Sequence, residues 1–202
     1  IVGAGSDWFH IDNEVNGGST TRGTPQDTDG TYARIFLEGG ELQCAYIARL
    51  REVAPVVVRP MRGNHDYQTS LAVSVWIRER FRADDHVDVS ISPAPRQYLE
   101  VGNTIVGITH GEDVKDIKLP GLMATEAREM WGRTKHRLWF TGHWHTQITN
   151  EYNGVRVIHC PSLAGSDNWH ARHGYVGNRK ALTAYLIDND EGLVAELPVS
   201  AR

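Results

Sequence analysis

The stretch PVVVRPMRGNHDYQ, residues 55–68, indicates the class of fold that this chain adopts. It begins with the apolar, β-branched run PVVV (55–58), which predicts a buried strand. The polar residues GNHD follow, and they are poor formers of both strand and helix. Next, TSLAVSVWIRERF (69–81) predicts a helix with Thr69 or Ser70 as its N-cap. A strand, a polar loop and a helix in this order are typical of an α/β fold.

The rest of the chain alternates in the same way. IVGA (1–4) predicts a short strand, and apolar positions at helical spacing predict a helix over 31–53. Gly39 and Gly40 lie inside that helix and predict a kink. The further predicted elements are hairpins turning at Gly102-Asn103 and Asn153-Gly154, a helix over 118–131, a strand over 137–140 and a final hairpin in ALTAYLIDNDEGLVAEL. With no internal repeat or linker, the sequence predicts one α/β domain over residues 1–202.

Composition narrows the classes of function. The 202 residues carry a formal net charge of −4, so no overall basic field indicates nucleic-acid binding, although a local basic patch remains compatible with it. Cys44 and Cys160 are the only cysteines, which suits a reducing compartment and gives no disulfide framework. No apolar run is long enough to span a membrane, and no signal peptide is visible. We therefore predict a cytoplasmic protein without a membrane partner, and leave protein partners open.

Polar side chains follow four predicted strands at the point where each strand ends. The segments are GSDWFH, RGNHD, THGED and TGHWH. In open α/β sheets, ligands bind outside the carboxyl ends of the strands, so these side chains could converge on one site. The candidate residues are Asp7, His10, Asn64, His65, Asp66, His110, His143 and His145.

The residue types in this set suit metal-assisted phosphoryl chemistry. Asp, Asn and His without Cys offer nitrogen and oxygen ligands, which favour Mn²⁺, Fe or Zn²⁺ over Ca²⁺. Two metals that share a carboxylate can stabilise both the attacking and the leaving oxygen of a phosphoryl displacement, and they activate a water at neutral pH. A histidine that is not a ligand can stabilise the phosphate or protonate the leaving group.

Each motif also has a structural interpretation. Asp7 could cap a turn, and His110 could be a hydrogen-bonded histidine at a strand end. Gly, Asn and Asp in GNHD all favour a turn, but a turn does not need His65. In GHWH the histidines at i and i+2 can share a face. Together, in this order and at strand ends, the motifs favour the functional interpretation.

The sequence resembles the calcineurin-like metallophosphoesterase superfamily, through SDWFH, GNHD, THG and GHWH over residues 5–145. The resemblance implies a four-layer α/β/β/α sandwich with two divalent metals, Mn²⁺ first and Fe or Zn²⁺ as alternatives. It further implies the roles of single residues: Asp7 as bridging ligand, Asn64, His110 and His143 completing one metal site, His145 in the other, and His65 as the catalytic histidine, oriented by Asp66.

A narrower resemblance concerns DWFH. In the double-strand-break repair exonucleases of this superfamily, a similar Asp-x-Phe-His brings a second catalytic histidine to the phosphate, and His10 matches that position. The loop HIDNEVNGGSTTRGTPQDTD (10–29) and GSDNWH (165–170) also resemble phosphoesterases of bacteriophages and prophages. Ser6 stands where the family has glycine, and the family's first motif, Asp-x-His on the first strand, is absent. Because the chain begins with Ile1 inside a strand, we expect this domain to be N-terminally incomplete, lacking its first strand.

The loops around the site predict a nucleic-acid substrate. Loop 13–30 offers Arg22 among hydroxyl and amide groups suited to phosphate, and Trp169 and His170 could stack on a base and contact its backbone. A solvated loop is the alternative for each. The leading hypothesis is therefore a metal-dependent phosphodiesterase, a nuclease of exonuclease type acting on DNA or RNA. The alternatives are a phosphatase or phosphodiesterase for small molecules or proteins, and a degenerate, non-catalytic binding scaffold.

Overall fold

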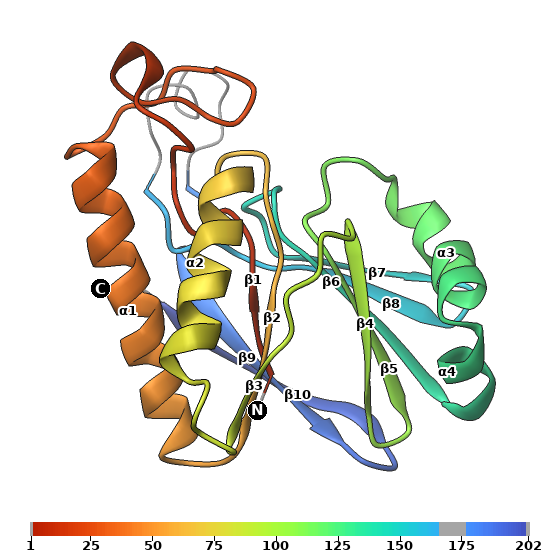
Figure 1. The fold of residues 1–202 in the computed structure, drawn as a ribbon. Helices are drawn as coiled ribbons and strands as arrows, with labels where there is room; N and C mark the ends of the chain where they lie inside the picture. Colours follow the sequence, from red (N-terminus) through yellow and green to blue (C-terminus); the bar gives the residue numbers. More distant parts are fainter. Residues whose placement is uncertain (1, 166–176, 201–202) are drawn as a thin grey trace. The chain divides into compact units, whose positions relative to one another are not determined.

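The computed structural model describes residues 2–165 and 177–200, with side chains described from Gly5 onward (Figure 1). The chain divides into two compact units, Ile1–Pro95 and Arg96–Arg202, and each unit is described by itself. Both units combine helices with a β-sheet, which confirms the predicted α/β class. That the two units form one domain stays a prediction. Within the described ranges, no helix is long and apolar enough to cross a membrane.

The first unit contains a three-stranded parallel sheet with the strand order β1-β2-β3. Two helices lie side by side against this sheet (Figure 1). The elements are β1 (Val2–Gly5), η1 (Val15–Gly17), α1 (Tyr32–Arg51), β2 (Val56–Pro60), α2 (Tyr67–Arg80) and β3 (Val87–Val89). The predicted strands over 1–4 and 55–58 are thus confirmed within one or two residues.

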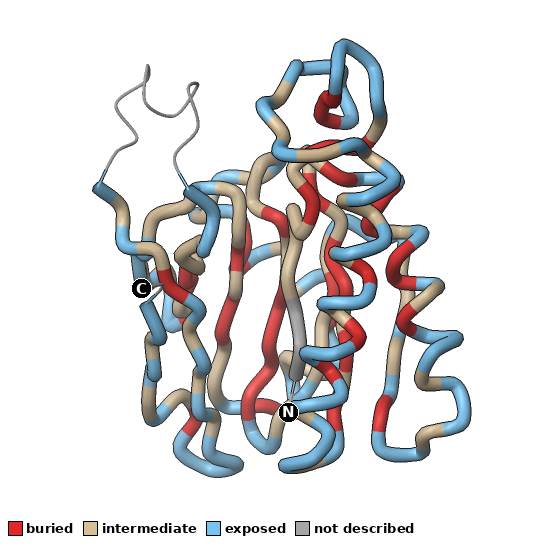
Figure 2. The backbone as a smooth tube through the Cα atoms, turned by 90° about the vertical axis from the view of Figure 1, so that its left-hand side faces the viewer, coloured by how far each residue is buried: buried red, intermediate tan, exposed pale blue. Residues whose placement is uncertain are grey.

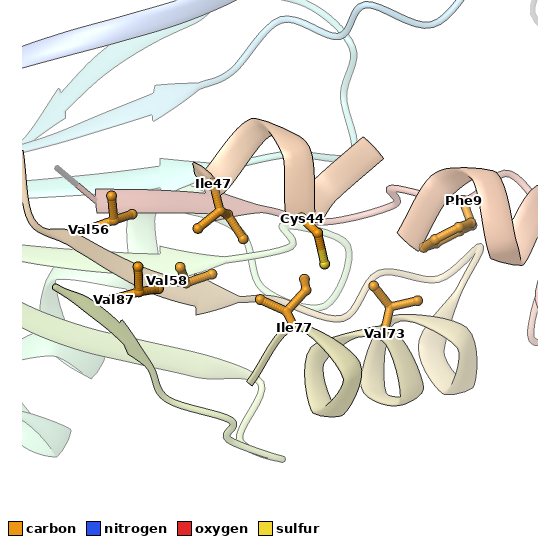
Figure 3. Close-up of a cluster of buried hydrophobic side chains, with 8 residues drawn as sticks. All are labelled: Phe9, Cys44, Ile47, Val56, Val58, Val73, Ile77 and Val87. Atoms are coloured by element: carbon orange, nitrogen blue, oxygen red, sulfur yellow. The ribbon is translucent and has the colours of Figure 1, made fainter. Parts of the chain in front are cut away.

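One core joins the helices of the first unit to its sheet. Alternate residues of β2 are buried, because successive side chains of a strand point to opposite faces. Val56 and Val58 of this strand pack against α1 and α2 (Figure 3). The close-up shows Cys44 and Ile47 of α1 and Val73, Ile77, Val87 and Phe9 in the same cluster. Phe9 belongs to the SDWFH motif, so this motif is anchored in the core.

The predicted helix over 31–53 is α1, which continues through Gly39 and Gly40 as one helix of 20 residues. Its two glycines serve close packing. A Cβ atom on Gly39 would lie 2.3 Å from the ring of Phe9, and one on Gly40 would lie 2.2 Å from the ring of Trp76. The absence of a side chain therefore lets two aromatic rings contact the helix backbone.

The second predicted helix begins earlier than the sequence suggested. The helix α2 starts at Tyr67 with Asp66 in the N-cap position, so the prediction of Thr69 or Ser70 as the cap is wrong. Thr69 and Ser70 lie inside the first turn and are buried. The backbone amide of Thr69 donates instead to Asp12, a residue of a distant loop. An acceptor from elsewhere in the chain cannot be found from the local sequence pattern.

The second unit contains a five-stranded sheet with the order β4-β5-β6-β8-β7 and a separate two-stranded sheet of β10 and β9. Strands β5, β6 and β8 are parallel, while β4 and β7 run antiparallel to their neighbours. The elements are β4 (Arg96–Val101), β5 (Thr104–Thr109), η2 (Asp116–Lys118), α3 (Leu119–Glu126), α4 (Arg128–Arg133), β6 (His136–Thr141), β7 (Ile148–Tyr152), β8 (Val155–His159), β9 (Ala181–Asp188) and β10 (Gly192–Ser200). The three predicted hairpins and the strand over 137–140 are confirmed.

Helices α3 and α4 cover one face of the five-stranded sheet. Trp139 of β6 is completely buried there, and its indole N–H donates to the carbonyl oxygen of Leu119. Ile105, Val155 and Val157 from the neighbouring strands pack into the same core. The region predicted as a helix over 118–131 is two helices, divided at Ala127. Figure 2 shows buried positions recurring along the strands, with exposed positions at the loops between them.

Candidate functional site

The first unit brings the ends of β1 and β2 together. These strands are parallel neighbours with Gly5 opposite Pro60, so they end at the same edge of the sheet. Asp7 follows β1 by two residues, and the segment GNHD follows β2. Two of the four predicted strand-end motifs therefore lie next to each other, as the rule for the carboxyl ends of parallel strands requires.

The carboxylate of Asp7 lies directly against the GNHD segment. Its Oδ1 atom accepts a hydrogen bond of 2.9 Å from the backbone amide of His65. A Cβ atom on Gly63 would come within 1.9 Å of the same oxygen, so only glycine fits at this position. Asp7 itself has φ of 50°, a backbone conformation that is rare for residues other than glycine. The strained backbone and the missing side chain of Gly63 together allow this contact.

The two predicted catalytic histidines are in contact. The rings of His10 and His65 stack with centroids 5.2 Å apart and an interplanar angle of 18°. Nδ1 of His65 lies 3.1 Å from the carbonyl oxygen of His10. Because a carbonyl oxygen only accepts, Nδ1 is the nitrogen that carries a proton, and Nε2 is the nitrogen left to exchange one.

The carboxylate of Asp66 holds the backbone on both sides of the site. Asp66 is completely buried, and its carboxylate accepts from the backbone amides of Phe9, at 3.0 Å, and Gly63, at 3.3 Å. Burial raises the pKa of this carboxyl, and the hydrogen bonds from its neighbours oppose the rise. The backbone of His10 contacts the ring of His65, and Asp66 holds the SDWFH segment against GNHD. That Asp66 orients His65 stays a prediction.

Asp12 connects loop 13–30 to the start of α2, a role that the local sequence does not indicate. It is buried, and its carboxylate accepts from the amides of Gln68 and Thr69 at the start of α2. It also accepts from the hydroxyls of Thr69, at 2.8 Å, and Thr21, at 2.7 Å. Thr21 in turn donates its amide to the carbonyl oxygen of Asn64. One carboxylate thus joins loop 13–30, the GNHD segment and the helix that follows it.

An arginine and a tyrosine flank GNHD. The guanidinium carbon of Arg62 lies 3.7 Å from the ring centroid of Tyr67, and Nη2 of Arg62 donates to the carbonyl oxygen of Pro93. In the part of the chain that the structure describes, Arg62 has no carboxylate partner. Tyr67 donates its amide to the hydroxyl of Thr21, so this pair is also connected to loop 13–30.

The second unit brings the remaining predicted ligands together. The parallel strands β5 and β6 end in register, with Thr109 opposite Thr141. His110 and His143 follow them, and their rings lie edge to face with centroids 5.0 Å apart. The carbonyl oxygen of His110 also accepts from the amide of Gly142, which joins the two loops. His110 is buried, whereas His143 is partly exposed.

The GHWH turn is held in an unusual backbone conformation. His143 has φ of 66° and His145 has φ of 52°, and the amide of Trp144 donates to the carbonyl oxygen of Gly142. Non-glycine residues at such angles indicate strain, and strain of this kind clusters at functional sites. The turn thus carries two predicted ligands on strained backbone.

A third histidine lies at the end of a parallel strand in this unit. His159 ends β8 opposite Thr141 of β6, and it is buried. Its Nε2 atom pairs with Asp116 at 2.8 Å, and its ring stacks on the indole of Trp144 at 5.9 Å and 12°. The strand-end rule that selected His110 and His143 applies equally to His159, so it could have been found from the sequence.

Of the predicted substrate-binding residues, only Arg22 lies in the described ranges. Arg22 is exposed and follows Thr21, which is tied to Asn64 and Asp12. Trp169 and His170 lie outside the described residues. Loop 13–30, which carries Arg22 among hydroxyl and amide groups, is therefore fixed to the GNHD segment through Thr21.

Comparisons with known proteins find similarity among solved structures. No protein-family model and no curated protein match the chain. Among the similar structures are wild-type Vps29 from Entamoeba histolytica complexed with Zn²⁺, 15% identical over 98% of each chain with a TM-score of 0.45, and a novel archaeal phosphodiesterase, 13% identical over 99% of each chain with a TM-score of 0.44. A conserved uncharacterised protein and predicted phosphoesterase from Streptococcus pneumoniae TIGR4 is 12% identical over 99% of this chain and 97% of that chain, with a TM-score of 0.40. Similarity this low assigns no activity, which is inferred below from the residues of this chain.

Proposed function

We propose that this protein is a metal-dependent phosphodiesterase acting on nucleic acid. The observation that carries the proposal is the arrangement in the first unit, where the carboxylate of Asp7 contacts GNHD beside the stacked rings of His10 and His65. A structural turn needs neither the two histidines nor the strained backbone of Asp7. A ligand carboxylate beside a proton-exchanging histidine is what phosphoester hydrolysis requires.

The donor atoms of the predicted ligands fit a divalent cation. Asp7 and Asn64 of the first unit offer oxygen, and His110 and His143 of the second offer nitrogen, the mixed set that Mn²⁺, Fe and Zn²⁺ accept. His145 would be a ligand of a second cation. When bound, these cations would neutralise charge on the phosphate and activate a water for attack.

The chain's own residues supply the remaining steps. With Nδ1 of His65 held by the carbonyl oxygen of His10, Nε2 can give a proton to the leaving oxygen. The ring of His10 covers that of His65 and offers a second hydrogen-bonding group. Arg22 of loop 13–30 and Arg62, which precedes GNHD, supply positive charge for the substrate backbone. Asp66 and Asp12 keep the segments that carry these groups in place.

The test uses the full-length protein with Mn²⁺ and end-labelled single-stranded DNA and RNA. We expect a product ladder from the wild type and none from His143→Ala. His86→Ala, which removes an exposed histidine of the first unit, is the matched control and should cut normally. If the wild type leaves both DNA and RNA intact, nucleic acid is excluded as the substrate.

The two alternative functions give different results. A small-molecule or protein phosphatase would cleave phosphomonoesters or short diesters in a substrate panel but leave oligonucleotides intact. A non-catalytic scaffold would show no hydrolysis of any substrate, and His65→Ala would be indistinguishable from the wild type.

A further inference from the structure

Trp144 is exposed in a place where folding does not require an aromatic residue. It lies between His143 and His145 in the turn after β6, and 52% of its surface is exposed. In the described part of the chain it is the only exposed tryptophan. A glycine-initiated turn does not need a large side chain, and an exposed indole leaves apolar surface in water. The exposed surface of this indole is therefore available to contact a ligand.

The indole is nevertheless held in one orientation. One face stacks on the ring of His159, with centroids 5.9 Å apart at 12°, and the indole meets the ring of His143 at 79°. His159 is itself buried and paired with Asp116. His159 and His143 thus each contact the indole of Trp144, and its exposed area lies on the remaining surface.

We propose that the exposed face of Trp144 stacks on a base of the nucleic-acid substrate. This inference rests on the proposed function and names the surface that would hold a nucleotide next to the reacting phosphate. Base–aromatic stacking suits any sequence, because every base has a π face. Since Asp116 and His159 already fix the indole, little side-chain freedom is lost on binding.

The chemistry around Trp144 favours a base over an apolar protein partner. The residues next to it in the chain are His143, His145, Thr146 and Gln147, and Thr146 accepts a hydrogen bond from Asn178. A protein-docking surface would need a continuous apolar patch around the indole. An aromatic side chain flanked in the chain by hydrogen-bonding residues suits a nucleotide better.

The test measures binding separately from hydrolysis. Phosphorothioate-linked single-stranded DNA, which resists cleavage, is titrated into the protein with Mn²⁺, and a second series of oligonucleotides carries one abasic position at each site in turn. The variants are Trp144→Leu, which removes the aromatic face, and Trp144→Phe, which keeps a smaller one. Tyr46→Leu is the matched control, because Tyr46 is a similarly exposed aromatic residue on α1.

We expect Trp144→Leu to weaken binding of the complete oligonucleotide by roughly 5- to 100-fold. At one abasic position the affinity of the wild type should fall by about the same factor. The affinity of Trp144→Leu should not fall further at that position, because the substitution and the missing base remove the same contact. Trp144→Phe should retain most of the affinity, Tyr46→Leu should bind as the wild type, and DNA should quench the fluorescence of the wild type more than that of Trp144→Phe.

Two results would overturn the inference. In the first, Trp144→Leu binds the complete oligonucleotide as tightly as the wild type. In the second, Trp144→Leu loses further affinity by the same factor at every abasic position. If such a protein still cuts DNA, the proposed function stands and only the stacking surface is wrong. If the wild type neither binds nor cuts DNA or RNA, both proposals fail.

Discussion

The two units hold their candidate residues by a different balance of contacts, although the stacked rings of His10 and His65 in the first unit and the pair of Asp116 with His159 in the second show that each uses both kinds. In the first unit, carboxylates accept hydrogen bonds from backbone amides: Asp7 from His65, Asp66 from Phe9 and Asp12 from Thr69. In the second unit, aromatic rings pack against one another: His110 on His143, and Trp144 on His159. Hydrogen bonds to buried amides depend on single atoms, whereas ring contacts depend on shape. Substitutions in the first unit should therefore have the larger effects.

The two regions share strained backbone. Asp7, His143 and His145 all have φ between 50° and 66°. Such backbone costs on the order of 1 kcal/mol per residue, and the surrounding structure must enforce it. The contacts that hold this backbone are mainly hydrogen bonds to carboxylates in the first unit and ring contacts in the second, and substitutions can test this difference.

The largest expected effect is that of Gly63→Ala. The new Cβ would lie 1.9 Å from Oδ1 of Asp7, so the carboxylate must move and the hydrogen bond from His65 must break. A displacement of about 1 Å in a catalytic group costs on the order of 100-fold in rate, and we expect at least that loss of metal-dependent hydrolysis. The control is Gly121→Ala in α3, where no atom lies within 4 Å of the added carbon and activity should persist. Normal activity in Gly63→Ala would show that Asp7 tolerates a different position.

The second effect concerns the anchor in the first unit. Asp12→Ala leaves the amides of Gln68 and Thr69 without their acceptor and releases the hydroxyl of Thr21. We expect a loss of about 3 kcal/mol in the free energy of unfolding, and roughly half of that for Asp12→Asn, which keeps one acceptor oxygen. Denaturant titration measures both. Equal stability of Asp12→Ala and the wild type would contradict the picture of a first unit held by carboxylates.

Much of the fold could be predicted from the sequence because its signals are local. The β-branched run at 55–58 and the Asn153-Gly154 turn depend on residues close together in the chain, and both are confirmed. The same local patterns predict where β1 and β2 end and which polar residues follow them. Local signals thus sufficed for the elements and for which motifs follow the strands.

What could not be predicted depends on residues far apart in the chain. Asp12 binds amides 56 and 57 residues away, and nothing in its own segment distinguishes it from a solvated aspartate. The low helix propensity of Gly39 and Gly40 predicts a kink. Their packing role could not be predicted, because the rings of Phe9 and Trp76 that need the space are distant in sequence. Asp66 is a further example, since its carboxylate binds the amide of Phe9, 57 residues away.

A smaller effect is expected in the second unit. Asp116→Ala removes the partner of the buried His159, whose ring supports Trp144. We expect a loss of about 1 kcal/mol in the free energy of unfolding, because one hydrogen bond is lost and the stacked rings remain. Denaturant titration should also show less destabilisation than for Asp12→Ala. A larger loss than for Asp12→Ala would reverse the proposed difference between the two units.

The smallest effect concerns an ion pair at the surface of the second unit, an interaction of a different type from the packed rings. Arg96 donates to Glu126, and with the hydroxyl of Tyr98 it lowers the pKa of this carboxyl. A lowered pKa in the folded state means that Glu126 stabilises the protein above the ordinary glutamate pKa of about 4.3, and that this contribution is lost as the pH falls through the lower, folded value. Glu126→Gln should therefore lower the melting temperature at pH 7 by a small amount and reduce its decrease below about pH 4.3. Glu129→Gln on α4 is the control, and melting curves from pH 7 to acid measure both variants. An unchanged acid dependence in Glu126→Gln would mean that the ion pair adds nothing to folding, and that the second unit depends on its packed rings and core alone.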